Sequence, residues 1–73
     1  MDAPRVIVHP PSASGGRRVR VGAEVLGTAY SLRDVAEFLR RAGLEGLDAS
    51  DVAESDLIEW RGGGPDEWMP PPL

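Results

Sequence analysis

The residues closest to a catalytic pattern are one histidine and two serines near the N-terminus. His9 is the only histidine of the chain, and Ser12 and Ser14 follow it after two prolines. An imidazole beside a hydroxyl is the pairing that activates a serine nucleophile. Such catalysis also needs a group that orients the imidazole and donors for an oxyanion, and the pattern supplies neither. We therefore expect His9 to end a strand beside a mobile loop, and we predict no catalytic residue and no enzyme.

A second pattern consists of four acidic side chains in the second half of the chain, namely Asp48, Asp51, Glu54 and Asp56. Carboxylate oxygens are the ligands that hard cations prefer. Their spacing is not that of a calcium-binding loop, and helix capping accounts for two of the four acids. We expect no metal site here.

Three consecutive glycines, residues 62–64, have the composition of a phosphate-binding loop. Pro65 follows them, and then the acidic pair Asp66 and Glu67, whose carboxylates would repel a phosphate. A loop or linker explains the glycines better, so we predict no cofactor.

The arginines of the N-terminal part form a more informative pattern. Residues 1–30 hold four arginines against two acids, whereas residues 31–73 hold four arginines against ten acids. Three of the first four arginines, Arg17, Arg18 and Arg20, lie in one expected strand. Because side chains alternate along a strand, Arg18 and Arg20 project to the same side, where they could contact phosphates of a nucleic acid. A solvated sheet face, salt-bridged to local acids, is the other explanation.

The junction after these strands resembles the strand-to-helix junction of the plant AP2-type three-stranded DNA-binding domain. The resemblance is carried by Leu26, Gly27, Thr28, Ser31, Asp34 and Ala36. In that family the sheet reads DNA, which the resemblance would imply here. This chain lacks the aromatic- and basic-rich sheet of the family, so shared capping chemistry also explains the match.

Two of the four aromatic residues are tryptophans in the C-terminal part. Trp60 lies in an expected strand and is expected to belong to the core. Trp68 lies beyond the glycines, so it either folds back over the sheet or stays exposed as an anchor for a partner. Small domains need every large apolar group, which favours folding back. Trp68 and Met69 are our candidate residues for binding a protein partner.

Local patterns predict four strands and two helices. β-Branched residues and period-two alternation indicate the strands, whereas caps and a 3.6-residue period indicate the helices. The expected strands cover residues 5–9, 17–21, 24–29 and 57–61, and the expected helices cover residues 32–42 and 49–54. Ser31 with Asp34 forms a capping box, Tyr30 with Val35 fits a hydrophobic staple, and Gly43 fits the position after the helix end.

This order of elements predicts an α+β domain of two layers, with a three- to four-stranded, mostly antiparallel sheet and one main helix packed on one of its faces. The apolar side of the helix, carrying Val35, Phe38 and Leu39, would cover the sheet. If the chain crosses back after a meander of three strands, the last strand lies parallel to the first, in the order 3-2-1-4. The short second helix could instead reverse the chain and bring the last strand in antiparallel.

Length and composition limit the possible classes of protein. The 73 residues suffice for one domain, which we assign to residues 1–61, followed by a Gly/Pro-rich tail of residues 62–73. The chain has no cysteine, which excludes disulfides and thiolate metal sites. A formal charge of -4 argues against binding of a polyanion by the whole molecule. The start has no pattern of a signal peptide and the longest aliphatic run is three residues, so we expect a cytoplasmic protein that does not bind membranes.

All eight basic residues are arginines, and Lys, Asn and Gln are absent, as in proteins encoded by high-G+C bacterial genomes. The blocks VIVHPP, RRVRVGAEVLGTAYSLRDVAEFLRRAGL and DLIEWRGGGP resemble small uncharacterised actinobacterial proteins. That resemblance implies no activity. Our leading hypothesis is a non-enzymatic interaction module that binds an unknown protein, or itself, through an open sheet edge or the Trp68 tail. The alternative is a nucleic-acid-binding accessory protein that uses Arg17, Arg18 and Arg20.

Overall fold

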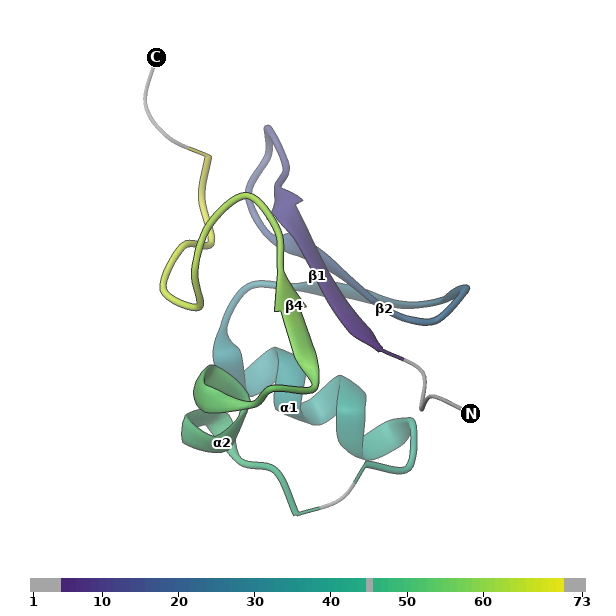
Figure 1. The fold of residues 1–73 in the computed structure, drawn as a ribbon. Helices are drawn as coiled ribbons and strands as arrows, with labels where there is room; N and C mark the ends of the chain where they lie inside the picture. The colour runs from purple at the N-terminus through teal and green to yellow at the C-terminus, as the bar shows by residue number, and fades with distance from the viewer. Residues whose placement is uncertain (1–4, 45, 71–73) are drawn as a thin grey trace.

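The computed structural model describes residues 5–44 and 46–70 (Figure 1). It contains every expected strand and helix. The elements are β1 (Val6–Pro11), β2 (Arg17–Val21), β3 (Glu24–Ala29), α1 (Leu32–Arg41), α2 (Ala49–Glu54) and β4 (Ile58–Trp60).

The four strands form one mixed sheet in the order β3-β2-β1-β4. The pairs β3–β2 and β2–β1 are antiparallel, whereas β4 runs parallel to β1. The domain is therefore α+β, and the first of the two expected topologies is confirmed. The central place of β1 explains its run of three aliphatic residues. Val6 and Val8 face the core, and Ile7, on the other face, is only 8% exposed.

The β2–β3 hairpin closes with a two-residue turn, in which Gly22 has a φ of 58°. Val19 lies opposite Gly27 and Arg20 lies opposite Val25, so Leu26 is an extra residue that forms a β-bulge. The two-residue turn fixes the face of Val25, and the bulge shifts the pairing of the residues that follow Leu26. Val25 shares a face with Arg20, whereas the half-buried Leu26 packs against the core.

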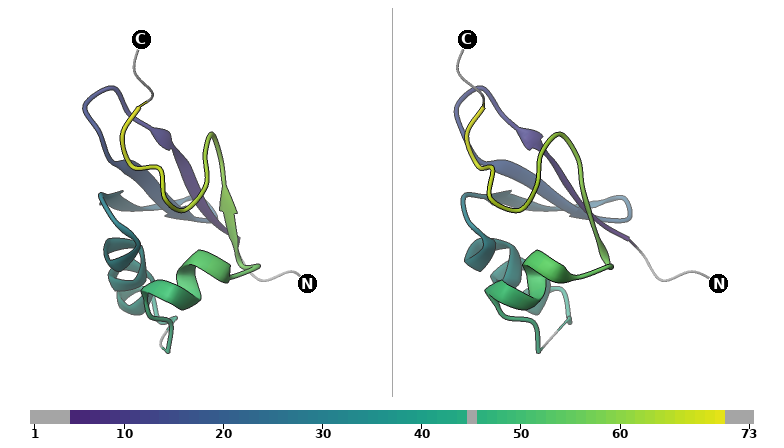
Figure 2. Two further views of the ribbon diagram at one scale, coloured as in Figure 1. Left: turned by 90° about the vertical axis from the view of Figure 1, so that its left-hand side faces the viewer. Right: turned by 60° about the vertical axis from the view of Figure 1, so that its left-hand side comes forward.

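Both helices lie on the same side of the sheet (Figure 2). The expected apolar side of α1 is buried there, because Val35 and Leu39 have no exposed surface. Phe38 approaches the backbone of β3 so closely that a Cβ atom built on Gly27 would lie 2.8 Å from its ring. The core cluster combines residues from both layers, namely Val6, Val8, Val19, Ala29, Val35, Leu39, Val52 and Ile58.

The helix ends follow the expected capping rules with one difference. At the start of α1, the Ser31 hydroxyl accepts from the Asp34 N–H at 3.2 Å, but the Asp34 carboxylate accepts from the Tyr30 N–H rather than from Ser31. At the end of α1, the N–H groups of Gly43 and Leu44 donate to carbonyls of the last turn, which is a Schellman ending. Asp48 and Asp51 form a complete capping box on α2.

We expect Ser31→Ala to lower the free energy of unfolding by about 1 kcal/mol, because the first turn of α1 loses the acceptor for one N–H group. A shift of the urea midpoint without a change of slope would be the expected observation. Ser50→Ala is the control, since the Ser50 hydroxyl donates to a side chain, the Asp48 carboxylate, rather than capping a backbone group. Equal effects of the two substitutions would contradict the capping role of Ser31.

Strand β1 is longer than expected, because the two prolines do not end it. Pro11 still pairs with Arg17, after a shift of register between Val8 and Pro11. Prolines within sheets occur at such irregularities, where their missing N–H costs no regular ladder bond. The longer strand brings the loop of residues 12–16 to the end of the sheet, where it borders the candidate site.

Candidate functional site

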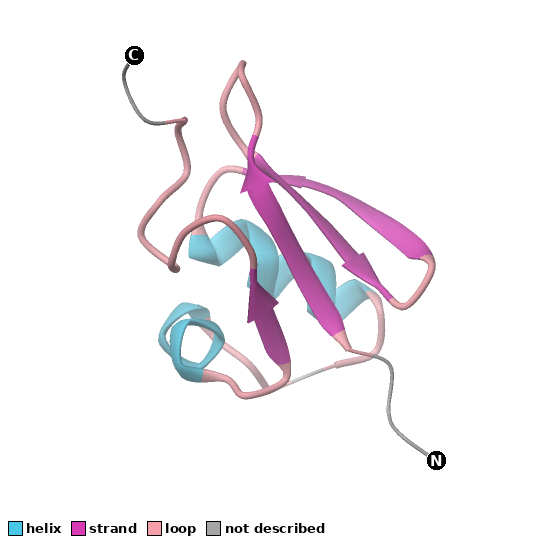
Figure 3. Ribbon diagram, turned by 45° about the horizontal axis from the view of Figure 1, so that its top comes forward, coloured by secondary structure: helices cyan, strands magenta, loops and turns pink. Residues whose placement is uncertain are grey.

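One face of the sheet is not covered by the helices, and we call it the open face. In Figure 3 the strands pass in front of α1, and no described segment crosses their front. Strand registers assign seven side chains to this face: Ile7, His9, Arg18, Arg20, Val25, Thr28 and Glu59. They are the side chains that alternate with the core residues of each strand.

The open face carries two arginines that lack an acidic partner. Arg18 and Arg20 make no ion pair within the described part of the chain, and the buried Nε of Arg20 has no hydrogen-bond acceptor there. By contrast, Arg5 and Arg61 both contact Glu59. The middle of the face therefore holds two uncompensated positive charges, although the whole chain is acidic.

Apolar surface lies beside these charges. Val25 is 55% exposed and faces the neighbouring position Arg20 across the β2–β3 ladder. Ile7 lies on the other side of Arg20 and is nearly buried. The aliphatic stem of an arginine covers apolar neighbours while its guanidinium stays accessible. The open face thus combines charge with an exposed aliphatic side chain, as protein-binding surfaces do.

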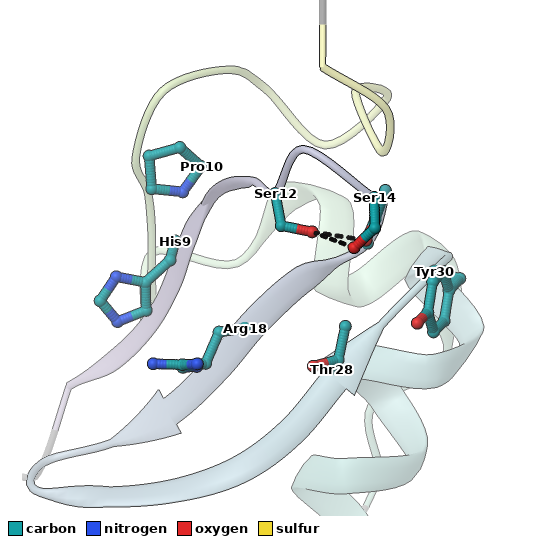
Figure 4. A pocket seen from close by; sticks show the side chains of 9 residues that line it. His9, Pro10, Ser12, Ser14, Arg18, Thr28 and Tyr30 are labelled. Carbon is teal, nitrogen blue, oxygen red and sulfur yellow. Dashed lines mark hydrogen bonds between the residues drawn. The ribbon is translucent and has the colours of Figure 1, made fainter.

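A pocket of about 410 Å³ lies at the end of the open face, beside the loop of residues 12–16. Figure 4 shows His9 next to Arg18, with Ser12 and Ser14 on the loop above them and Thr28 and Tyr30 on the other side. The remaining lining residues are Pro10, Gly15 and Gly16.

The hydroxyls of the loop interact with each other and with the backbone. Ser12 Oγ lies 3.3 Å from Ser14 Oγ and donates to the Gly15 carbonyl at 2.7 Å. Tyr30, expected as a hydrophobic staple, is instead 62% exposed at the pocket rim. Its ring approaches Gly16, where a Cβ atom would lie 2.7 Å from Cε1. A glycine at this position lets the phenol border the pocket.

The environment of His9 favours the neutral imidazole. Burial lowers its pKa most, and the positive charges of Arg20, Arg61 and Arg18 lower it further. The three arginines come from β2 and from the residue after β4, so they surround His9 from both sides of β1.

We expect the stability of the domain to depend on the protonation of His9. The pKa of His9 is lower in the folded protein than its ordinary value of 6.5, so the unfolded chain binds this proton more readily. The contribution of neutral His9 to the free energy of unfolding is therefore fully present above pH 6.5. It is lost as the pH falls through the pKa that His9 has in the folded protein. Urea midpoints above and below pH 6.5 should differ more for the natural protein than for His9→Gln. Equal differences in the two proteins would contradict this expectation.

Arg17 lies on the opposite side of the sheet from Arg18 and Arg20, and it has no exposed surface. All five of its N–H groups donate to backbone carbonyls. The distances are 2.8 Å to His9, 2.8 Å to Arg61, 3.0 Å to Gly63, 2.7 Å to Gly64 and 2.9 Å to Glu67. Arg17 therefore has no free donor for a phosphate, and its assignment to a nucleic-acid face is corrected to a structural role.

The Arg17 guanidinium also lies between the two tryptophans. Its Cζ is 5.2 Å from the ring centre of Trp60 and 5.8 Å from that of Trp68, and the two rings meet edge to face. The Trp68 carbonyl accepts from the Gly16 N–H at 2.8 Å. Of the two expected states of Trp68, the structure shows the folded-back one.

The expected tail therefore packs on the domain over most of its described length. In Figure 1 this segment, in yellow-green, lies beside β4 and above α2. Trp68 is half-buried against the core, so its indole is occupied within the domain, whereas Met69 is 67% exposed. Residues 71–73 of the predicted tail lie outside the described residues. Of the two candidate residues for a protein partner, Met69 alone presents its side chain to solvent.

Val25, Thr28 and Tyr30 belong to the site, although no sequence pattern indicated them as site residues. Val25 is found there because the two-residue turn pairs it with Arg20, and Thr28 because the bulge at Leu26 brings it opposite Arg18. The alternation of β2 already separates Arg18 and Arg20 from Arg17. Only the register with β3 adds the residues beside them.

Among residues 5–44 and 46–70, no helix combines the length and apolar character that crossing a bilayer requires. Within the same residues, no three side chains of His, Cys, Asp or Glu gather as a metal site would require. Comparison of the chain with protein-family models, curated proteins and solved structures finds no match.

Proposed function

We propose that the protein is a non-enzymatic interaction module that binds another protein on the open face of its sheet. The observation that carries this proposal is the pair Arg18 and Arg20, which lack acidic partners among the described residues and lie beside the exposed Val25. An acidic, partly apolar segment of a partner would supply the missing countercharges and cover Val25.

Binding rather than catalysis is supported by the hydrogen bonds around the pocket. The Ser12 hydroxyl contacts Ser14 and the Gly15 carbonyl, and no described hydrogen bond joins a hydroxyl to the His9 imidazole. A serine without a base at hydrogen-bond distance is a weak nucleophile.

A protein partner is favoured over a nucleic acid by the charge of the rest of the molecule. Apart from Glu24 and Glu59, the acids of the described residues lie outside the strands, on the helices, between α1 and β4, or after β4, and the chain as a whole has a formal charge of -4. This field repels a long polyanion, whereas a short acidic segment can contact two arginines locally. We further propose that the domain acts in the cytoplasm and that it comes from a high-G+C bacterium; the absence of Lys, Asn and Gln supports the second point.

A photo-crosslinking amino acid in place of Val25 tests the proposal in cells that make the protein. We expect one discrete adduct that is sensitive to protease and resistant to nuclease. The double variant Arg18→Glu with Arg20→Glu should reduce the adduct at least tenfold. The control Arg33→Glu with Arg41→Glu changes the charge equally on α1 and should retain it.

The same crosslinker in place of Met69 tests the C-terminal segment, because Met69 is exposed there. An adduct from position 69 but not from position 25 would overturn docking on the open face. Equal loss in both double variants would overturn a specific role of Arg18 and Arg20. An adduct of two copies of this chain would overturn the proposal of a separate partner.

Nucleic-acid binding is the second candidate, and the same unpaired Arg18 and Arg20 favour it. With Arg17 buried, two arginines of the predicted three remain for phosphate contacts. This candidate predicts DNA or RNA affinity that falls steeply with salt and disappears in Arg18→Ala with Arg20→Ala. Absence of binding at about 50 mM salt, where such contacts are strong, would exclude it.

A further inference from the structure

We propose that the pocket beside the loop of residues 12–16 binds a phosphate monoester, carried by a phosphorylated serine or threonine of the partner protein. This inference rests on the proposed function, because the pocket opens on the same face as the partner surface. It adds the chemical group that the partner would present there.

The pocket offers polar groups from several directions, which suits a tetrahedral anion. Arg18 and His9 lie together on one side, and Thr28 and Tyr30 lie across from them, from β3 and the residue after it (Figure 4). Ser14 lies above, on the loop, next to Ser12, whose hydroxyl hydrogen is already donated to the Gly15 carbonyl. A planar carboxylate has two oxygens for such donors, whereas a phosphate monoester has three terminal oxygens and more charge.

Charge in and around the pocket favours an anion of this kind. Arg18 makes no ion pair with any described acid, and none of the nine residues that line the pocket is acidic. Arginine donates two parallel hydrogen bonds to phosphate oxygens, which is the strongest type of contact available here. A volume of about 410 Å³ also leaves room for the group together with part of the side chain that carries it.

His9 adds a donor whose state responds to the ligand. The groups that face it are Arg18 and Arg20 from β2 and Arg61 after β4, with Glu59 nearby through its contact with Arg61. Without a ligand these arginines disfavour the imidazolium. A bound dianion reverses the local field, so the imidazole gains a proton and becomes a second cationic donor to the phosphate.

The test uses the NMR signals of His9, which report one site because the chain has a single histidine. The ligands are a short glycine peptide with a central phosphoserine, the same peptide with serine or glutamate, inorganic phosphate and an oligothymidylate. We expect the phosphoserine peptide to shift the His9 signals and to raise the pKa of His9 by about one unit. The serine and glutamate peptides should leave both unchanged.

Two pocket variants and one matched control complete the experiment. Arg18→Gln should weaken binding of the phosphoserine peptide roughly tenfold or more, since a charge-assisted contact is lost. Thr28→Val removes one exposed hydroxyl and should weaken binding severalfold. Arg33→Gln removes the same charge from the exposed side of α1 and should leave binding unchanged.

Three results would overturn the inference. If no ligand shifts the His9 signals, the pocket does not bind phosphate, while a crosslink from position 25 would still support docking of an unmodified partner. Inorganic phosphate that binds as well as the peptide would show a site for a free anion rather than for a phosphorylated chain. An oligothymidylate that binds more tightly than the peptide would assign the pocket to nucleic-acid backbones.

Discussion

Replacing Arg17 with methionine is expected to lower the free energy of unfolding by about 3 kcal/mol or more, since several carbonyls lose their donor in a buried place. Methionine fills much of the volume of the arginine stem but donates no hydrogen bond. The carbonyls that Arg17 binds, those of His9 and of four residues of the C-terminal segment, then depend on water. This water must enter between Trp60 and Trp68. A domain of this size has a total stability of roughly 3–5 kcal/mol, so the loss should approach complete unfolding.

The C-terminal segment should be released first when Arg17 is replaced. Four of the five acceptors of Arg17 belong to residues 61–67, so this side chain fastens the segment to the sheet. Tryptophan fluorescence of Arg17→Met should shift to the red as Trp68 becomes solvated. Urea unfolding followed by circular dichroism then gives the loss of stability of the remaining domain.

Two further variants separate the geometry of Arg17 from its charge. Arg17→Lys keeps the charge but has three donors instead of five in a fixed fork, so it should also be destabilised, by less than Arg17→Met. Arg18→Met makes the same replacement at the next, exposed position and should change stability by no more than about 0.5 kcal/mol. An Arg17→Met protein as stable as Arg18→Met would contradict the role of the guanidinium.

Arg17 also shows where the sequence was informative and where it was not. Period-two alternation placed Val19 and Val21 on the core side of β2, and the same alternation places Arg17 with them. The charge of Arg17 led to its grouping with Arg18 and Arg20 instead. Its acceptors are backbone carbonyls of a Gly-rich segment about 44 to 50 residues away, and carbonyls have no signature in a sequence. The two tryptophans were the available sign of an enclosed cation.

Local interactions explain why the elements themselves were predictable. Ser31, Asp48 and Gly43 act through hydrogen bonds within a few residues, so their roles follow from neighbours in the chain. The two possible positions of β4 differ only in contacts between distant residues. The open face depends likewise on the pairing of β2 with β3, and the bulge at Leu26 that brings Thr28 opposite Arg18 has no strong sequence signal.

The second large effect is expected from Leu39→Ala, which should lower the free energy of unfolding by about 2–5 kcal/mol. Leu39 has no exposed surface and belongs to the core cluster that joins α1 with α2 and the sheet. Alanine leaves a cavity that cannot close fully, because the strands beneath α1 and the neighbouring α2 limit how far α1 can move. The loss is comparable to the whole stability of a domain of this length. A measurable fraction of the variant should therefore be unfolded even before urea is added.

The two largest effects should differ in what unfolds. Arg17→Met should solvate Trp68 before helical structure is lost, whereas Leu39→Ala should lose helix and tryptophan burial together, since its cavity lies within the shared core. Leu57→Ala removes the same atoms from a side chain that is 50% exposed and should cost less than about 1 kcal/mol. If Leu39→Ala cost no more than Leu57→Ala, α1 would not lie on the sheet, and the open face would no longer be the only uncovered side of the described sheet.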